Sequence, residues 1–400
     1  MTETWTLAAL WLGLALLAGL ASIWLRVATA LSEIVVGVVA GALIGTVAMG
    51  VDLQWVRFLA GAGAIILTFL AGAELDPEVF RRKWKEATAV GLVSFLAPFL
   101  GCAAAARWLL GWDPAASWLA GVAMSTTSVA VVYAVMIEFG FNTTDYGKTV
   151  LAACFITDLG TVVALGLLFA PFTLKTLIFV GALVAIALAV PWLTPRFFRR
   201  YGARASELEA KYLLVLLFGL GALASWADSE AVLPAYVLGM MLAGTVGRDH
   251  ALVRRLRTLC FGLMTPFYFI RAGSFVSMPA LIAAPAAFVL MLVVKVMTKI
   301  AGVYPVTRAF QAPRKEGMYT TLLMSTGLTF GTISSLFGLS HGVVDQAQYS
   351  ALVTAVIASA VIPTLIANAW FLPRHHLPAP TSMARVETNI AAPPARGRGS

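Results

Sequence analysis

The chain has 400 residues, of which 60% are hydrophobic and only 12% are charged. Soluble domains carry about 25% charged residues, so this composition excludes an ordinary soluble fold and predicts a membrane protein that contacts lipid. The net charge of +9 would suit a nucleic-acid partner. However, the basic residues collect in loops between apolar runs, a pattern typical of membrane topology, and we expect no nucleic-acid partner.

Thirteen apolar runs are predicted to form transmembrane helices, because about 20 apolar residues cross a bilayer. In chain order the predicted spans are Trp5–Leu25, Leu31–Met49, Val56–Ala73, Ala87–Leu110, Ser117–Phe139, Lys148–Ala170, Leu174–Thr194, Lys211–Trp226, Val232–Val246, Thr258–Val276, Leu281–Thr307, Met318–Gly338 and Tyr349–Phe371.

The basic loops predict the orientation of these spans. If the N-terminus lies outside, the outer loops hold only Arg57, Arg107 and Lys175, and the inner loops hold most other basic residues. The positive-inside rule therefore predicts a multi-pass cell (inner) membrane protein with its N-terminus outside and its C-terminus in the cytoplasm. Residues 373–400 are rich in Pro, Ala, Gly and Arg, and we expect a disordered cytoplasmic tail and no soluble regulatory domain.

One carboxylate lies deep in a predicted span, Asp158 within Lys148–Ala170. An acid at that depth costs about 2.5–3.5 kcal/mol on insertion scales, so it is expected to be functional. When ionised it offers hard oxygen ligands to a monovalent cation, and when protonated it is neutral. We therefore interpret Asp158 as a shared cation and proton site. Three basic residues also fall within spans: Arg271, Lys295 and Lys299.

The cysteines and histidines indicate no further chemistry. Cys102, Cys154 and Cys260 lie in apolar runs without metal-ligand spacing, and they are interpreted as small packing residues. The four histidines lie in loops and show no ligand pattern. We therefore expect no cofactor. Without a histidine cluster, a Ser–His pair or paired acids in the spans, we also expect no enzymatic activity.

Two spans contain polar interruptions. Gly121–Val132 includes four consecutive hydroxyl residues, and Met324–Ser335 includes Ser325, Thr326 and Gly327. Opened helix backbone at membrane depth is tolerated where it lines protein or a water-filled cavity. The two interrupted spans are seven apart, an odd number, so they run in opposite directions. The pattern predicts two inverted six-helix repeats with crossed broken helices, which is typical of a transporter; the alternative is two ordinary helices whose hydroxyls bond to backbone carbonyls.

From Leu12 to about Phe371 the chain resembles the monovalent cation/proton antiporter family 2, the sodium or potassium/proton exchangers. The resemblance rests on short motifs in the expected order: SEIVVGVVAGALIG at 32–45, LTFLAGAELDP at 67–77, STTSVAVV at 125–132, ITDLG at 156–160, TPFYFIRAG at 265–273 and KIAG at 299–302.

The resemblance implies a homodimer of thirteen-helix subunits, each with a dimerisation domain and a moving core domain. The dimerisation domain would comprise helices 1–3 (residues 1–76) and helices 8–10 (209–278). Helices 4–6 (77–171) and helices 11–13 (279–372) would form the core domain, with helix 7 in a linker at 172–208.

The chain departs from the family pattern at two places. Electrogenic members carry two adjacent acids in the ion-binding helix, whereas here the first position is Thr157. Many members have Arg-Gly-Glu in the second broken helix, whereas here the sequence is Thr-Gly-Leu at 326–328. With one titrating acid, we expect one cation to displace one proton, so that exchange is electroneutral.

The predicted binding residues are Asp158, which would hold the metal cation, with hydroxyls and carbonyls from Thr157, Thr126, Thr127 and Ser128. Site-tuning or structural roles are predicted for Lys299, Lys295, Glu74 and Arg271, and Ser325, Thr326 and Gly327 belong to the second break. The predicted function is exchange of a monovalent cation, sodium first, for protons by alternating access, in pH homeostasis. A potassium/proton exchanger remains an alternative, as does a sodium-coupled organic-anion symporter of related fold.

Overall fold

The structure is a computed structural model that describes residues 2–25, 28–73, 77–169, 174–202, 206–227, 232–247, 249–276 and 285–377. Within these ranges it is all-helical, with no strand. The α-helices are α1 (Thr2–Leu25), α2 (Thr29–Leu43), α3 (Gln54–Ala73), α4 (Pro77–Trp108), α5 (Pro114–Ser125), α6 (Val129–Glu138), α7 (Asp145–Phe169), α8 (Leu174–Tyr201), α9 (Leu208–Trp226), α10 (Val232–Leu242), α11 (His250–Leu259), α12 (Thr265–Ser274), α14 (Pro285–Ala309), α15 (Arg314–Leu323), α16 (Thr329–Ser340) and α17 (Gln346–Ile366).

Each predicted span overlaps one helix or a pair of helices. Nine helices in the described part of the chain are long and apolar enough to cross a membrane. The prediction of an all-α, multi-pass membrane protein is therefore confirmed. The count of thirteen spans and the inverted repeat stay predictions.

Helix α2 ends at Leu43, six residues before the predicted end at Met49, and two other helices extend beyond their predicted spans. Helix α4 begins at Pro77, ten residues before the predicted start, because a basic and polar segment continues the helix beyond the apolar run. Helix α8 continues past Thr194 to Tyr201 through two internal prolines. A hydropathy pattern marks the apolar part of a helix, so it does not detect these polar extensions.

A π-helical turn at Cys260–Met264 joins α11 to α12. Pro266 explains this turn, since a proline lacks the amide hydrogen and clashes with the carbonyl four residues earlier. The widened turn resolves that clash without ending the helix. The predicted span at Thr258 therefore belongs to a longer helical segment that begins at His250.

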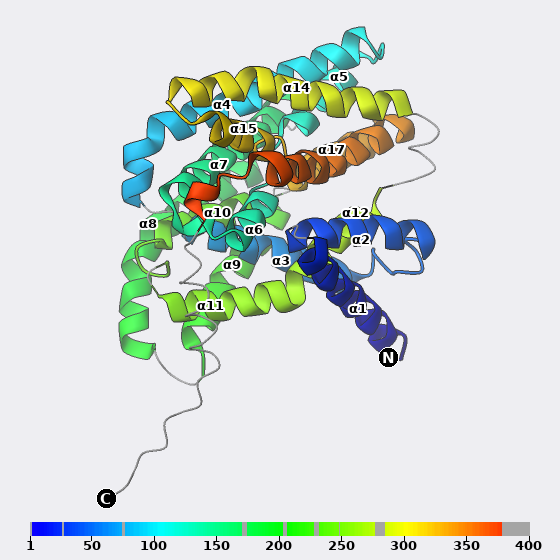
Figure 1. Ribbon diagram of the computed structural model, residues 1–400. Helices are drawn as coiled ribbons and strands as arrows, with labels where there is room; N and C mark the ends of the chain where they lie inside the picture. The colour runs from blue at the N-terminus through cyan, green and yellow to red at the C-terminus, as the bar shows by residue number, and fades with distance from the viewer. Residues whose placement is uncertain are drawn as a thin grey trace, which may run out of the picture.

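The helices pack in two groups, which lie in the upper and lower parts of Figure 1. In the first group α4 packs along α5, α7 and α14, and α14 also packs on α15 and α17. In the second group α2 packs on α12, and α3 packs on α10. Helix α6 lies between the groups and contacts both α3 and α7.

Close backbone contact holds the second group together. A Cβ atom added to Gly37 of α2 would lie 2.1 Å from the carbonyl oxygen of Ile270, and one added to Gly273 of α12 would lie 2.0 Å from that of Ile34. A larger side chain at either position would therefore separate the two helices. Small residues at such crossings are typical of helix packing in membranes, where backbones must approach closely to gain dispersion energy.

Candidate cation and proton site

The two predicted interruptions are breaks in the helices at residues 126–128 and 326–328, and they lie against each other. The backbone N–H of Ser128 donates to the carbonyl oxygen of Thr326 at 3.2 Å. The hydroxyl of Thr127 donates to the carbonyl oxygen of Met324 at 2.7 Å. Backbone groups that the breaks remove from helical hydrogen bonding are thus satisfied by the opposite break, as a membrane interior requires.

Asp158 lies on α7 beside the first break. Its side chain is buried, with 4% of the residue exposed, and its Oδ1 atom has no hydrogen-bond partner. The carboxylate lies near the backbone N–H groups of Thr127 and Val129. These amides lie at the start of α6, where the first N–H groups of a helix have no partner within the helix and favour an anion. The fold therefore places the acid at a helix N-terminus and leaves one of its oxygens available.

Lys299 of α14 is fully buried and bonds to three neutral oxygens around the first break. Its Nζ atom donates to Ser94 Oγ at 2.7 Å, to Thr127 Oγ1 at 3.0 Å and to the Ser125 carbonyl at 3.2 Å. Hydroxyl and carbonyl oxygens are also the ligands of hard monovalent cations. The oxygen cluster around this ammonium group thus has the chemistry of a cation site.

Lys295 lies one helical turn away from Lys299 and packs against the second break. It is also fully buried, and its Nζ atom donates to Ser359 Oγ of α17 at 3.0 Å. A Cβ atom on Gly327 would lie 2.3 Å from Lys295 Nζ and 2.9 Å from Thr126 Oγ1. A side chain at this point of the break would therefore require the end of the lysine to shift.

The other hydroxyls predicted for the two breaks donate to helix carbonyls. Thr157 Oγ1 lies 3.0 Å from the Gly91 carbonyl and 3.1 Å from that of Ala153. The remaining donors follow the same local pattern: Thr126 to Ala123, Ser325 to Thr321, and Thr326 to Leu323. Ser128 instead caps α6 by accepting from the amide of Val131 at 3.4 Å. These residues lie at the site, but in this structure all of them except Ser128 direct their hydroxyl hydrogens to the backbone.

Two further predicted residues do not line the breaks. Arg271 donates from Nε to the Val51 carbonyl at 2.8 Å and pairs with Asp52 at 3.3 Å, which gives it a structural role near the start of α3. Its guanidinium also stacks on the ring of Phe275, 4.7 Å from the centroid. Glu74 lies outside the described residues.

The structure adds three residues that the sequence reasoning did not assign. Ser94 and Ser359 bond to the two buried lysines, and each is a lone hydroxyl in an apolar run, a weak signal. Glu33 of α2 is also buried, with 5% exposed, although it lies near the start of a predicted span, Leu31–Met49. Asp158 is therefore not the only buried carboxylate.

A cavity of about 270 Å³ lies between α4, α7 and α15. Its rim carries charged groups from Lys83, Glu86, Asp145 and Glu316, and it extends inward to Ala153. The carbonyl of Ala153 accepts from Thr157, the residue before Asp158. The cavity thus reaches α7 at Ala153, five residues before the acid.

In this helical membrane fold, two broken helices meet beside a buried acid and buried lysines. This arrangement is typical of an ion-coupled transporter. Residues 12–371 match the family of transmembrane sodium/hydrogen exchangers. This match covers most of the chain, and the chain belongs to that family of cation/proton antiporters, which confirms the resemblance found in the sequence.

The chain is 26% identical over 359 residues to the glutathione-regulated potassium-efflux system protein KefC of Escherichia fergusonii and, at the same level, to KefC of Shigella flexneri serotype 5b. These alignments cover 82% of this chain and 55% of the relatives, so the chain spans about half their length. In fold it is similar to the sodium proton antiporter MjNhaP1 of Methanocaldococcus jannaschii. The TM-score is 0.68 at 16% identity, over 93% of this chain and 99% of that one.

Proposed function

We propose that the chain exchanges a monovalent cation for a proton, and that Asp158 binds the two in turn. The observation that carries this proposal is the partnerless, buried Oδ1 atom of Asp158 beside the first helix break. A buried polar atom without a partner is uncommon in native structures, and a carboxylate oxygen in that position is suited to bind an ion. The ligand set would be completed by oxygens of Ser125, Thr127 and Thr157.

The transported cation is sodium or potassium. A structural neighbour is described as a sodium proton antiporter, whereas the curated relatives are potassium-efflux proteins. Sodium is the first candidate, and potassium is the second. A proteoliposome assay with a fixed pH gradient can decide between them when sodium, lithium and potassium are supplied in turn. The transported cation is the one that dissipates the gradient at the lowest concentration.

The substitution that tests the proposed role is Asp158→Asn, which keeps the size of the side chain and removes its titration. We expect the variant to fold and to lose cation-dependent proton movement in proteoliposomes. Asp345→Asn is the matched control, because Asp345 caps α17 and asparagine caps a helix equally well. Exchange by Asp158→Asn at the rate of the Asp345→Asn control would refute the proposal.

We further propose that the cavity beside α7 is the cytoplasmic access route, with the N-terminus outside. Thr149 lines the cavity, whereas Arg107 lies at the far end of α4. Thr149→Cys should react with an impermeant maleimide in inside-out vesicles, and Arg107→Cys in right-side-out ones. The native cysteines are all buried and give a low background. Labelling of both positions from the same side would contradict this orientation.

Alternating access requires one helix group to move against the other. We infer that α4–α7 and α14–α17 form the moving core, and that α1–α3 and α9–α12 form the dimerisation domain of a homodimer in the lipid bilayer. The glycine-packed crossing of α2 and α12 supports a rigid role for the second group. Transport of this kind uses no cofactor and no covalent chemistry, so we assign the chain no enzymatic role.

A further inference from the structure

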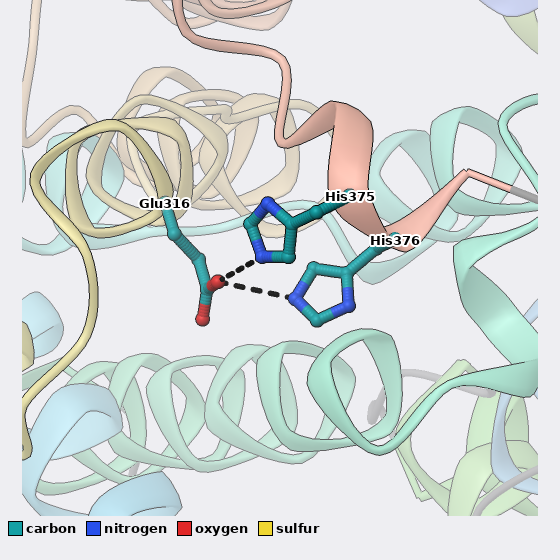
Figure 2. Close-up of side chains that lie close together, drawn as sticks. All are labelled: Glu316, His375 and His376. Carbon is teal, nitrogen blue, oxygen red and sulfur yellow. Dashed lines mark hydrogen bonds and ion pairs between the residues drawn. The ribbon is translucent and has the colours of Figure 1, made fainter.

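Three side chains from distant parts of the sequence meet beside the cavity, whose lining includes two of them, Glu316 and His376. Glu316 lies in the first turn of α15, and His375 and His376 lie in a 3₁₀ turn, Arg374–His376, after the last membrane helix. The Nε2 atoms of the two histidines lie 3.0 and 3.1 Å from Glu316 Oε2, and Figure 2 shows both rings directed at the carboxylate.

The geometry of this cluster suits a transition-metal ion. The three ligand atoms lie within 4.8 Å of one another. Zinc binds imidazole nitrogen and carboxylate oxygen at about 2.0–2.2 Å in tetrahedral sites, which separates neighbouring ligand atoms by roughly 3.3–3.5 Å. Small rotations of the three side chains would therefore admit the ion. The His375 side chain is 56% exposed, so a fourth ligand position can be taken by water.

Neighbouring residues hold part of the cluster in place. The ring of His376 stacks on Tyr146 of α7 at 5.0 Å between centroids, with an interplanar angle of 4°. The Tyr146 hydroxyl hydrogen-bonds with Thr320 Oγ1 of α15 at 2.9 Å. The Glu316 side chain is only 16% exposed. Such supporting contacts pre-orient ligands and raise metal affinity.

We propose that Glu316, His375 and His376 form a binding site for a divalent transition-metal ion of the zinc type. The bound ion joins the segment after the last membrane helix to α15, next to the start of the helix that carries Asp158. This site goes beyond the exchange function, and it does not depend on which cation is transported. Glu316 and His375 are 59 positions apart in the sequence, which explains why the sequence pattern did not indicate a site.

The test uses full-length purified protein without a polyhistidine tag, dialysed against zinc chloride. We expect one more zinc per chain in the wild type than in His375→Gln/His376→Gln. Glu316→Gln should weaken zinc binding at least tenfold. The control His250→Gln/His341→Gln removes the two histidines outside the cluster and should retain the ion.

X-ray absorption of the zinc-loaded wild type gives a second readout that needs no variant. It should report two imidazoles with further oxygen ligands and no sulfur. Equal zinc content in the wild type and in His375→Gln/His376→Gln, or loss of zinc in the His250→Gln/His341→Gln control, would overturn the proposal. An X-ray absorption spectrum of the zinc-loaded wild type without two imidazole ligands would also overturn the proposal. None of these results depends on transport, so the failure of the metal site and the failure of the exchange function are distinguishable.

Discussion

The break at 126–128 and the break at 326–328 contact each other, but they have different neighbours. The first lies against Asp158, and its Ser125 carbonyl and Thr127 hydroxyl accept from the buried ammonium of Lys299. The second lies against Lys295, which bonds to a single hydroxyl on α17. Both breaks open the helix backbone, so the difference lies in what each one faces.

The comparison indicates that the two breaks have different roles. The first supplies polar oxygens and helix N-terminal amides to one acid, which is the chemistry that binding a cation or a proton requires. The second break supplies the Thr326 carbonyl, which accepts from the Ser128 amide and so helps to position the first break. It also leaves space for Lys295 at Gly327. Substitutions in the first break should therefore affect ion binding, and those in the second should affect stability.

The largest expected difference concerns two threonines at corresponding places. Thr127→Val removes a hydroxyl that bonds both to Lys299 and to the Met324 carbonyl, and it leaves buried partners unsatisfied. Such a loss costs about 1–3 kcal/mol, roughly tenfold or more in cation affinity. Thr326→Val is the control, because the amide of Ser128 keeps the Thr326 carbonyl as its acceptor. Equal cation affinities of the two variants in proteoliposomes would remove the proposed distinction.

A smaller effect is expected from the lysines, and it concerns pH. Lys299 bonds to three oxygens around the first break, whereas Lys295 bonds to one hydroxyl on α17. Replacing Lys299 with glutamine removes a titratable group beside the break that adjoins Asp158, so the pH profile of exchange should shift, with transport retained. Lys295→Gln should shift the profile less, because Lys295 packs against the second break. A complete loss of exchange in a folded Lys299→Gln variant would contradict this tuning role.

The smallest effect is expected at Gly327, and it concerns stability. Gly327→Ala places a methyl group 2.3 Å from Lys295 Nζ. Because that atom is the end of a flexible side chain, the cost should be only about 1 kcal/mol, which lowers the thermal unfolding midpoint. Gly166→Ala on α7 is the control, because nothing lies within 4 Å of its added Cβ atom. That variant should be as stable as the wild type. An unchanged midpoint for Gly327→Ala would mean that Lys295 has room to move aside.

Much of this fold could be predicted from the sequence, because the bilayer imposes long apolar helices and makes an embedded carboxylate costly. The runs STTS at 125–128 and STG at 325–327 predicted the two breaks. Contact between the breaks was also expected, from the paired pattern and the family resemblance.

What could not be predicted is the pairing of single polar residues across helices. Lys299 contacts Ser94 at a sequence separation of 205 positions, and nothing in the local pattern of either residue indicates this contact. Two other features also arise from tertiary packing. They are the cluster of Glu316 with His375 and His376, and the burial of Glu33. The π-helical turn before α12 was also missed, although Pro266 is a local signal for it.

The central claim is that Asp158 alone exchanges a proton for one monovalent cation. Thr157 occupies the place of a second acid and does not ionise, so no net charge should move in a cycle. The most direct test measures cation-driven proton movement in proteoliposomes at several membrane potentials, imposed with an ionophore for an ion that the protein does not exchange. A potential is worth about 2.3 kcal/mol per charge per 100 mV, so electrogenic exchange would respond strongly. We predict that the rate and the end point are the same at every potential. A systematic change of either with potential would contradict one-for-one exchange at Asp158.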